Sequence, residues 1–378
     1  MQNVKNNIKN SLGGWKQSVV ATECTLHQLS PYIGKMKSLM AKSLIENFSS
    51  PGDTIYDPYV GCGTIALESW MLGRNVIAND LSPYAYTVTM GKMNPLKSED
   101  KILETIENIS KEIDEDSREI NLDLIPKWVR DFFNDKTLTE IVVWKDKLIS
   151  NDEHFLLSCL LGILHHQRPG FLSYPSSHTV PYLRDKKFPK NEFPDLYSYR
   201  PLKTRLQKKA LRAIKRLPNL DDSYVRKCFN QNSENLESPR MVDTIISSPP
   251  YMRRLDYGRD NRLRLWAVGE SDWKELDQVV SPSESNFMES MEKCFKTWLS
   301  FLKDNGKCVL VFDNSFSKKY KMPLVDAIVE IACKNVGGYR HLGNFEDEIP
   351  NERRVRRNHS GSKSEIIVVL EKSIFSNS

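Results

Sequence analysis

The sequence predicts an α/β fold that contains a parallel sheet and is interrupted by a mostly helical insertion. Two short apolar strands, at residues 54–57 and 75–80, each lead directly into a helical segment. Strands and helices that alternate this closely are typical of a parallel sheet, because parallel neighbours need a crossover. The alternation stops near residue 97 and resumes near residue 223. We therefore expect residues 1–96 and 223–378 to form two halves of one domain, with residues 97–222 inserted between them.

The individual elements follow from local signals. The glycine turn at 61–64 should open a helix that runs to residue 72, and Pro83 should occupy the first turn of the next helix. In the insertion, apolar periodicity over 155–164 predicts a buried helix. In the second half we expect strands at 224–229, 242–247, 307–312, 339–345 and 365–370, and helices at 287–302 and 323–334.

Composition excludes several protein classes. Charged residues make up 27% of the 378 positions and hydrophobic residues 39%, as in water-soluble globular proteins. Because no run of about 18 apolar residues occurs, we expect no membrane span. The seven cysteines never form a CxxC pair, so we expect no metal site and no disulfide framework, and the reducing cytoplasm as the setting.

One segment concentrates positive charge. Residues 184–216 hold twelve Lys or Arg and three acids, a net charge of +9, whereas the whole chain carries +5. Aromatic residues are interleaved in and beside this segment, namely Tyr182, Phe188, Phe193, Tyr197 and Tyr199. This mixture is typical of a surface for a polyanion with stackable bases, although a solvated surface is the alternative.

The stretch DPYVGCGT, residues 57–64, joins a strand to a helix. Gly61 and Gly63 permit a tight turn and close approach of a ligand, and Asp80, after the next strand, can accept both hydroxyls of a ribose. A dinucleotide site would place a third glycine where Ala66 stands. Asp57 would also repel a pyrophosphate but attract an ammonium group. A nucleoside that carries an amino acid, S-adenosyl-L-methionine, is therefore favoured.

The stretch SSPPY, residues 247–251, follows the apolar run 242–246. Two prolines cannot continue a helix or donate to a central sheet ladder, so the strand must stop sharply with an aromatic residue at its tip. A strand that merely ends at a turn is one interpretation. The other is that the strand end holds a flat ring against Tyr251.

Together these motifs resemble those of the amino-group DNA methyltransferases. DPYVGCGT is similar to their cofactor motif DPFxGxGT, and SPPY to their catalytic motif [DNS]PP[YFW]. Residues 27–36, HQLSPYIGKM, resemble the segment that closes over the methionine end of the cofactor. The resemblance covers residues 24–97 and 223–372. It implies a Rossmann-like class I methyltransferase fold, a mixed sheet with helices on both faces, and S-adenosyl-L-methionine as the cofactor.

The resemblance also implies site residues. The cofactor would be bound by Tyr32, Asp57, Tyr59, Gly61, Gly63, Thr64, Asp80, Leu81 and Asn232. Asn232 stands near a position where the family carries an acid. The catalytic residues would be Ser248, Pro249, Pro250 and Tyr251. The Ser248 hydroxyl and the Pro249 carbonyl would accept the N–H bonds of the target amine, and Tyr251 would stack on the extruded base.

The order of motifs, with the insertion between them, resembles the class whose target-recognition region lies there. Double-stranded DNA is then the expected partner. Contacts are expected from Arg184, Lys186, Lys187, Arg200, Lys203, Arg205, Arg253 and Arg254. The resemblance implies either a cognate restriction endonuclease in the same system, with no direct contact to the chain, or an orphan enzyme. The motifs carry no information on oligomeric state.

Several functions compete. In this family SPPY is mostly associated with N4-cytosine methylation and DPPY with N6-adenine methylation, so we expect N4 of cytosine, with N6 of adenine as the alternative. An RNA base methyltransferase and a non-catalytic nucleic-acid binder are further alternatives. A nicotinamide dehydrogenase fails on the missing third glycine. A C5-cytosine enzyme is excluded, because it needs a thiolate nucleophile and the chain has no Pro-Cys dipeptide.

Overall fold

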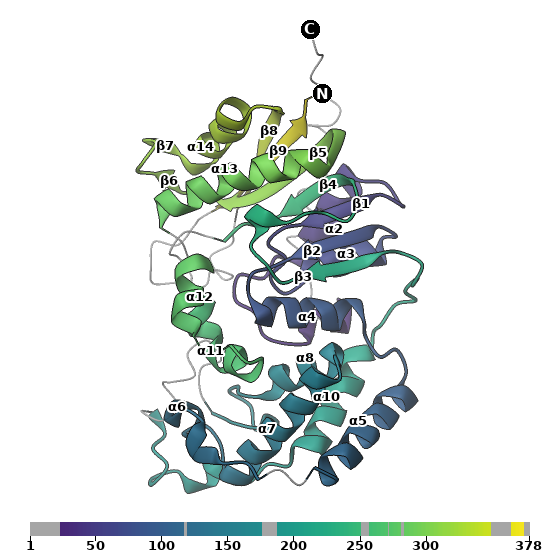
Figure 1. The fold of residues 1–378 in the computed structure, drawn as a ribbon, viewed down its shortest axis with the longest axis vertical. Coiled ribbons are helices and arrows are strands. Elements are labelled where there is room, and N and C mark those ends of the chain that lie inside the picture. Colours follow the sequence, from purple (N-terminus) through teal and green to yellow (C-terminus); the bar gives the residue numbers. More distant parts are fainter. Residues whose placement is uncertain are drawn as a thin grey trace.

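The structure of the protein is a computed structural model (Figure 1). The structure describes residues 23–116, 119–175, 187–250, 257–270, 272–280, 283–348 and 364–373. Among these residues, no helix is both long enough and apolar enough to cross a membrane.

A mixed sheet forms the centre of the domain. Its seven strands have the order β3-β2-β1-β4-β5-β9-β8 in the described part of the chain. The pairs among β3, β2, β1, β4 and β5 are parallel, whereas β9 runs antiparallel to both β5 and β8. This order, with one reversed strand near one edge, is the class I methyltransferase arrangement, so the predicted fold is confirmed. The strand bounds are β1 (Thr54–Asp57), β2 (Asn75–Asn79), β3 (Arg226–Phe229), β4 (Val242–Ser247), β5 (Leu302–Asp313), β8 (Tyr339–Glu348) and β9 (Ser364–Lys372).

Helices cover both faces of this sheet, as predicted. Successive residues of a strand point to opposite faces, and in β1 Ile55 and Tyr56 belong to different apolar clusters. Ile55 packs in the cluster of α2 (Ser38–Phe48), and Tyr56 in that of α13 (Glu284–Phe301) and α14 (Leu324–Glu330). The helices that follow the first two strands are α3 (Thr64–Met71) and α4 (Pro83–Met93).

The insertion is mostly helical. It contains α5 (Glu99–Asp114), α6 (Lys127–Arg130), α7 (Asp135–Ser150), α8 (His154–Ile163) and α10 (Leu202–Ile214). In Figure 1 these helices gather at one end of the molecule, below α4. Their buried residues form one apolar cluster with Trp70 and Tyr84 of the cofactor half. The insertion therefore shares its core with the domain that it interrupts.

Some elements differ from the prediction. Helix α13 begins at Glu284, because the Ser283 hydroxyl accepts a hydrogen bond from the Asn286 amide and caps the helix there. Strand β5 begins at Leu302, five residues earlier than predicted. The predicted helix at 323–334 is α14, followed by a π-helical turn over Ile331–Val336.

Two helices on the cavity side were not predicted, α11 (Tyr257–Ala267) and α12 (Trp273–Val280). In α11 three polar residues are buried, Asp260, Asn261 and Arg264. Because these polar side chains are buried among Leu263, Leu265 and Ala267, the buried face of this helix lacks the apolar periodicity by which a helix is recognised from its sequence.

Candidate active site

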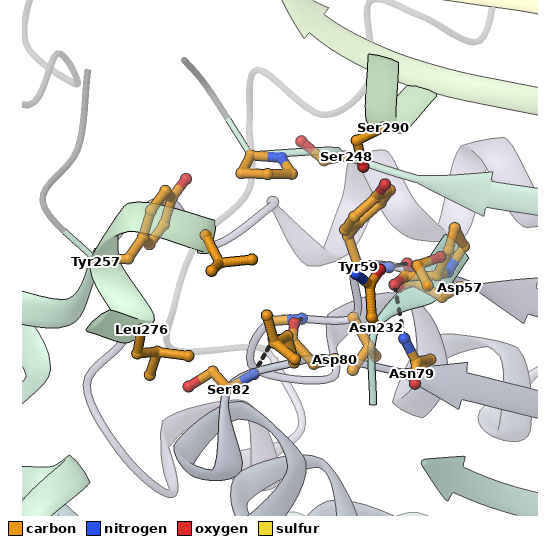
Figure 2. Close-up of a pocket in the computed structure, with 18 of the residues that line it drawn as sticks. Asp57, Tyr59, Asn79, Asp80, Ser82, Asn232, Ser248, Tyr257, Leu276 and Ser290 are labelled. Atoms are coloured by element: carbon orange, nitrogen blue, oxygen red, sulfur yellow. Dashed lines mark hydrogen bonds between the residues drawn. The ribbon is translucent and has the colours of Figure 1, made fainter. Parts of the chain in front are cut away.

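A cavity of about 490 Å³ opens where β1, β2 and β4 end (Figure 2). Carboxyl ends of parallel strands meet at one edge of a sheet, which is where open α/β sheets bind ligands. The predicted residues that line this cavity are Tyr32, Asp57, Tyr59, Gly61, Thr64, Asp80, Leu81, Asn232, Ser248 and Pro250. The two motifs, separated by more than 180 residues in the sequence, therefore face one space.

The glycine turn needs both of its glycines. Gly61 and Gly63 have φ angles of +52° and +73°, in the left-handed region that side chains other than glycine rarely adopt. A Cβ atom on Gly63 would also lie 2.9 Å from the Thr89 hydroxyl, and one on Gly61 would lie 3.3 Å from the Tyr32 ring. Gly63 therefore shapes the turn from behind the cavity wall, whereas Gly61 lies in the wall itself.

Asp57 is buried at the end of β1. Its carboxylate accepts a hydrogen bond from the Ser247 hydroxyl at 2.6 Å and from the Tyr59 amide at 3.3 Å. Burial raises the pKa of Asp57 to about 7, although both hydrogen bonds oppose this shift. A cation bound beside Asp57 would favour the charged carboxylate and reverse part of the shift. The side chain therefore suits a positively charged ligand group.

Asp80 follows β2 and is held by two backbone amides. Gly61 N donates to one carboxylate oxygen at 2.8 Å and Ser82 N to the other at 2.9 Å. Burial raises the pKa of Asp80 to about 6, and these amides oppose the shift. Each oxygen still has acceptor capacity toward the cavity. Asp80 is thus oriented to accept from a pair of hydroxyls, and it ties the glycine turn to the end of β2.

Asn232 and Tyr59 lie on the wall beneath α13. The Asn232 side-chain oxygen accepts from the Glu234 amide at 2.9 Å and caps a short 3₁₀ turn. The Tyr59 hydroxyl lies 3.2 Å from Cys294 Sγ, and its ring packs edge-on to Trp298. Both side chains line the cavity and are held in place by neighbours from the second half of the chain.

The SPP stretch follows β4 directly. The Ser248 hydroxyl donates to the Val311 carbonyl at 3.3 Å, which leaves its lone pairs as acceptors. Ser248 and Pro250 line the cavity, while Pro249 is buried beside them. The predicted stacking residue, Tyr251, lies outside the described residues.

Several cavity residues were missed by sequence reasoning. They come from α11, α12 and α13 and include Tyr257, Leu276, Asn286 and Ser290. Figure 2 shows Tyr257 and Leu276 across the cavity from Asp57 and Tyr59. Glu234 also lines the wall, two residues after Asn232, and forms an ion pair with Lys293 at 3.3 Å. Glu234 lies close to the position at which the family pattern carries an acid. Placing that pattern two residues later in the sequence would have identified it.

The basic segment is not uniformly available to a ligand. Arg200, a predicted DNA contact, is 8% exposed; its guanidinium stacks on Tyr174 at 4.3 Å and donates to the Pro169 carbonyl. Aromatic packing holds the Arg200 side chain inside the insertion, which argues against its expected contact with DNA, and that contact stays a prediction. Lys203 pairs with Glu107 at 2.9 Å, and Arg205 donates to the Pro201 carbonyl.

Lys187, in contrast, is exposed. The other predicted contacts, Arg184, Lys186, Arg253 and Arg254, lie outside the described residues.

The cavity fits S-adenosyl-L-methionine. Its volume falls within the range of small-molecule sites, roughly 300–1,000 Å³. Asp80 offers acceptors for ribose hydroxyls, and buried Asp57 suits a cationic methionine end. In the described residues no cluster of His, Cys, Asp and Glu has the geometry of a metal site.

Comparison with known proteins agrees with these features. A sequence profile described as DNA methylase, of the N6 and N4 type, matches residues 4–91. The chain is 26% identical over 301 residues to the type II methyltransferase M.BsoBI of Geobacillus stearothermophilus, an alignment that covers 68% of this chain and 55% of the relative. It is 22% identical to the type II methyltransferase M.MvaI of Kocuria varians, with 92% of this chain and 91% of the relative covered. The chain thus spans about half the length of the first relative.

Solved structures resemble the chain only distantly. The rRNA methyltransferase aviRa of Streptomyces viridochromogenes has a TM-score of 0.35 at 10% identity, with 92% of this chain and 89% of that protein covered. TrmN of Thermus thermophilus has a TM-score of 0.32 at 12% identity, covering 92% of this chain and 52% of that protein. Scores this low support no argument about substrate.

Proposed function

Because the chain belongs to the amino-group DNA methyltransferases, with S-adenosyl-L-methionine as cofactor, we propose that it methylates the exocyclic N4 of cytosine in double-stranded DNA. The observation that carries this proposal is the shared cavity. Asp57 and Asp80, suited to the two polar ends of the cofactor, line the same space as Ser248 of the SPPY motif.

The substrate amine is itself the nucleophile, so the protein does not have to supply one. It has to supply acceptors for the N–H bonds of that amine. Its lone pair is delocalised into the ring, and acceptors for its N–H bonds draw the nitrogen toward a tetrahedral geometry in which that lone pair can attack. S-adenosyl-L-methionine supplies an electrophilic methyl group when bound. Ser248 suits the acceptor role, because its own proton is directed to the Val311 carbonyl. The Pro249 carbonyl is the second acceptor, and the locked φ angles of the two prolines fix its direction.

The walls of the cavity supply positioning. Holding amine and methyl group in line lowers the barrier. The N–C bond would form as the S–C bond breaks, and the methylated nitrogen would release its surplus proton to water, so no protein side chain has to act as a base. The target base must leave the duplex to reach Ser248, since its amine is inaccessible within the stack. Tyr251 would stack on that base from the tip of the motif. Tyr257, which lines the opposite part of the cavity, narrows the space into which the base can enter.

The DNA would lie across the insertion and the mouth of the cavity. Exposed Lys187 and the basic residues at 184, 186, 253 and 254 are proposed to contact phosphates, which position the duplex without reading its sequence. The names of the curated relatives, both type II methyltransferases, support a place in a restriction–modification system. A cognate endonuclease would then recognise the same site independently.

N6-adenine methylation is the second candidate, since the same acceptors serve either amine. The serine at 248, where an aspartate is more often found in adenine enzymes, favours cytosine. The deciding experiment incubates the full chain with labelled S-adenosyl-L-methionine and mixed-sequence duplex DNA, followed by mass spectrometry of the nucleosides.

We expect N4-methylcytosine as the product. N6-methyladenine would instead support the second candidate. Label in neither base, with cofactor binding intact, would contradict DNA methylation, and label in RNA given in parallel would redirect the substrate class.

A further inference from the structure

The segment over the glycine turn, residues 24–36, has attachments that the proposed function does not use. We name it the cover segment. Tyr32, Gly34, Lys35 and Met36 at its end line the cavity, and the Tyr32 ring lies against Gly61. Its first part forms a 3₁₀ turn, η2 (Thr25–Gln28). The position of this segment therefore decides the shape of the cavity beside Gly61.

The cover segment is attached to the cofactor half through α3 and α4. His27 Nε2 lies 2.7 Å from the Glu68 carboxylate of α3. On α4, the Tyr84 ring stacks on Tyr32 at 5.7 Å, and the Tyr84 hydroxyl hydrogen-bonds Ser30 at 2.8 Å. These contacts join the segment to the helices that follow the first two strands.

A second set of attachments comes from the insertion. The Lys209 ammonium of α10 donates to the Gln28 carbonyl at 2.6 Å. The backbone amide of Arg216, after the same helix, donates to the Thr25 hydroxyl at 3.1 Å. Gly162 of α8 approaches so closely that a Cβ atom there would lie 2.0 Å from the Leu29 carbonyl oxygen. Thr25, Gln28 and Leu29 of the cover segment thus contact α8, α10 and the residue that follows α10.

Lys209 is an unusual residue for this helix. It is 7% exposed, whereas its neighbour Lys208 is exposed. Burial lowers the pKa of Lys209 to about 8. A buried ammonium is costly unless a good acceptor receives it, and here that acceptor belongs to the cover segment. The side chain spans the boundary between two regions that sequence reasoning would treat separately.

We infer that α8 and α10 of the insertion hold the cover segment in its cofactor-binding position, with Lys209 as the principal positioning residue. The insertion then sets cofactor affinity although none of its described residues lines the cavity. This inference rests on the proposed use of S-adenosyl-L-methionine. It gives the inserted region a task apart from DNA recognition.

The test is equilibrium binding of S-adenosyl-L-methionine to the full chain, by titration calorimetry without DNA. We expect Lys209→Met to weaken binding roughly tenfold, since loss of one charge-assisted hydrogen bond allows the cover segment to shift. Lys208→Met, the exposed neighbour, should bind within about twofold of the wild type. Leu138→Ala, in the apolar core of the insertion on α7, should lower the melting temperature while leaving cofactor affinity nearly unchanged.

Thr25→Val replaces the hydroxyl that accepts a hydrogen bond from the Arg216 amide. This variant tests the inference independently if Lys209→Met does not fold. We expect a twofold to fivefold weaker affinity for this nearly isosteric change. Wild-type affinity in every folded variant of Lys209 and Thr25 would overturn the inference, as would an equal loss in Leu138→Ala. A wild-type chain that does not bind S-adenosyl-L-methionine would instead contradict the proposed function.

Discussion

The strand-end site and the basic segment, residues 184–216, were both predicted from residue types. In the structure the predicted strand-end residues lie together, whereas the basic side chains divide into buried and exposed ones. At the strand ends, Asp57, Asp80 and Ser248 all line one cavity. In the basic segment, Arg200 and Lys209 are buried and donate to carbonyls within the protein, whereas Lys187 and Lys208 are exposed.

The difference comes from what fixes each position. Parallel strands force their carboxyl ends to one edge, so a residue directly after a strand has little choice of location. A lysine on a helix can face solvent, a partner or the core, and its stem is apolar enough to be buried. Positive charge in the sequence therefore marks a region but does not mark which side chains are available to DNA.

The largest expected effect is at Ser248. Ser248→Ala removes an acceptor for the target amine, and we expect single-turnover methyl transfer to fall roughly 10²- to 10³-fold, as when a transition-state hydrogen bond is deleted. Cofactor affinity should change by less than about twofold. Ser300→Ala, an exposed serine at the end of α13, is the matched control. Near-normal transfer by Ser248→Ala would remove Ser248 from the mechanism.

Asp80 should be next. Asp80→Ala removes acceptors for the ribose and also the partner of the Gly61 amide. Loss of charged hydrogen bonds of this kind costs roughly 1.5–3 kcal/mol, or about 10- to 100-fold in cofactor affinity. Calorimetric titration with S-adenosyl-L-methionine measures the change. An unchanged dissociation constant would show that the strand-end interpretation of Asp80 is wrong.

Arg200 tests the other region. Arg200→Met should lower the free energy of unfolding by about 1–2 kcal/mol, because a desolvated cation–π contact and a hydrogen bond are lost. DNA affinity, measured by fluorescence anisotropy on the folded variant, should stay near that of the wild type. Lys187→Ala should instead weaken DNA binding and leave the free energy of unfolding unchanged. The slope of log affinity against log salt concentration should become smaller by about 1. If Arg200→Met lost DNA affinity while its free energy of unfolding stayed that of the wild type, Arg200 would be a DNA contact after all.

Asp57 predicts a pH dependence of cofactor binding. Its pKa of about 7 means that the carboxylate charges as pH rises toward 7. An α-amino group remains protonated in that range, since its pKa is roughly 7.7–8.0. Cofactor affinity should therefore rise roughly tenfold between pH 5.5 and 7 if the charged carboxylate binds the ammonium. The increase should be smaller in Asp57→Asn, where Asp80, with a pKa of about 6, still becomes charged over this range. A flat profile in the wild type would contradict the assignment.

The stability of the ligand-free protein should move in the opposite direction. Because the folded-state pKa of Asp57 is raised, the folded state binds more protons than the unfolded state between about pH 4 and 7. The contribution of Asp57 to stability is then present at low pH and is lost as pH rises through 7. Urea unfolding of the wild type and Asp57→Asn at pH 5 and pH 8 measures this difference.

Sequence reasoning predicted the sheet and much of the cofactor wall for identifiable reasons. Val242–Ser247 is a largely buried strand that ends one residue before two prolines, and the structure has β4 with the predicted bounds. Helix α11 was missed because Asp260, Asn261 and Arg264 are buried polar residues, which a hydrophobic pattern assigns to the surface. Tyr257, Leu276 and Ser290 reach the cavity only through tertiary packing, so no local signal marks them. Arg200 stacks on Tyr174, which stands 26 positions earlier in the sequence, and no local pattern predicts a contact between residues so far apart.

The single apolar cluster that joins Trp70 and Tyr84 to Leu138, Phe155 and Leu206 has a consequence for engineering. A recognition region that folded by itself could be exchanged between relatives to transfer sequence preference. Here, replacement of residues 97–222 would also remove packing partners of α3 and α4 and the carbonyl contact to Gln28. Chimaeras of this protein should therefore be made by grafting surface side chains onto the existing helices, with the buried residues of the insertion kept as they are.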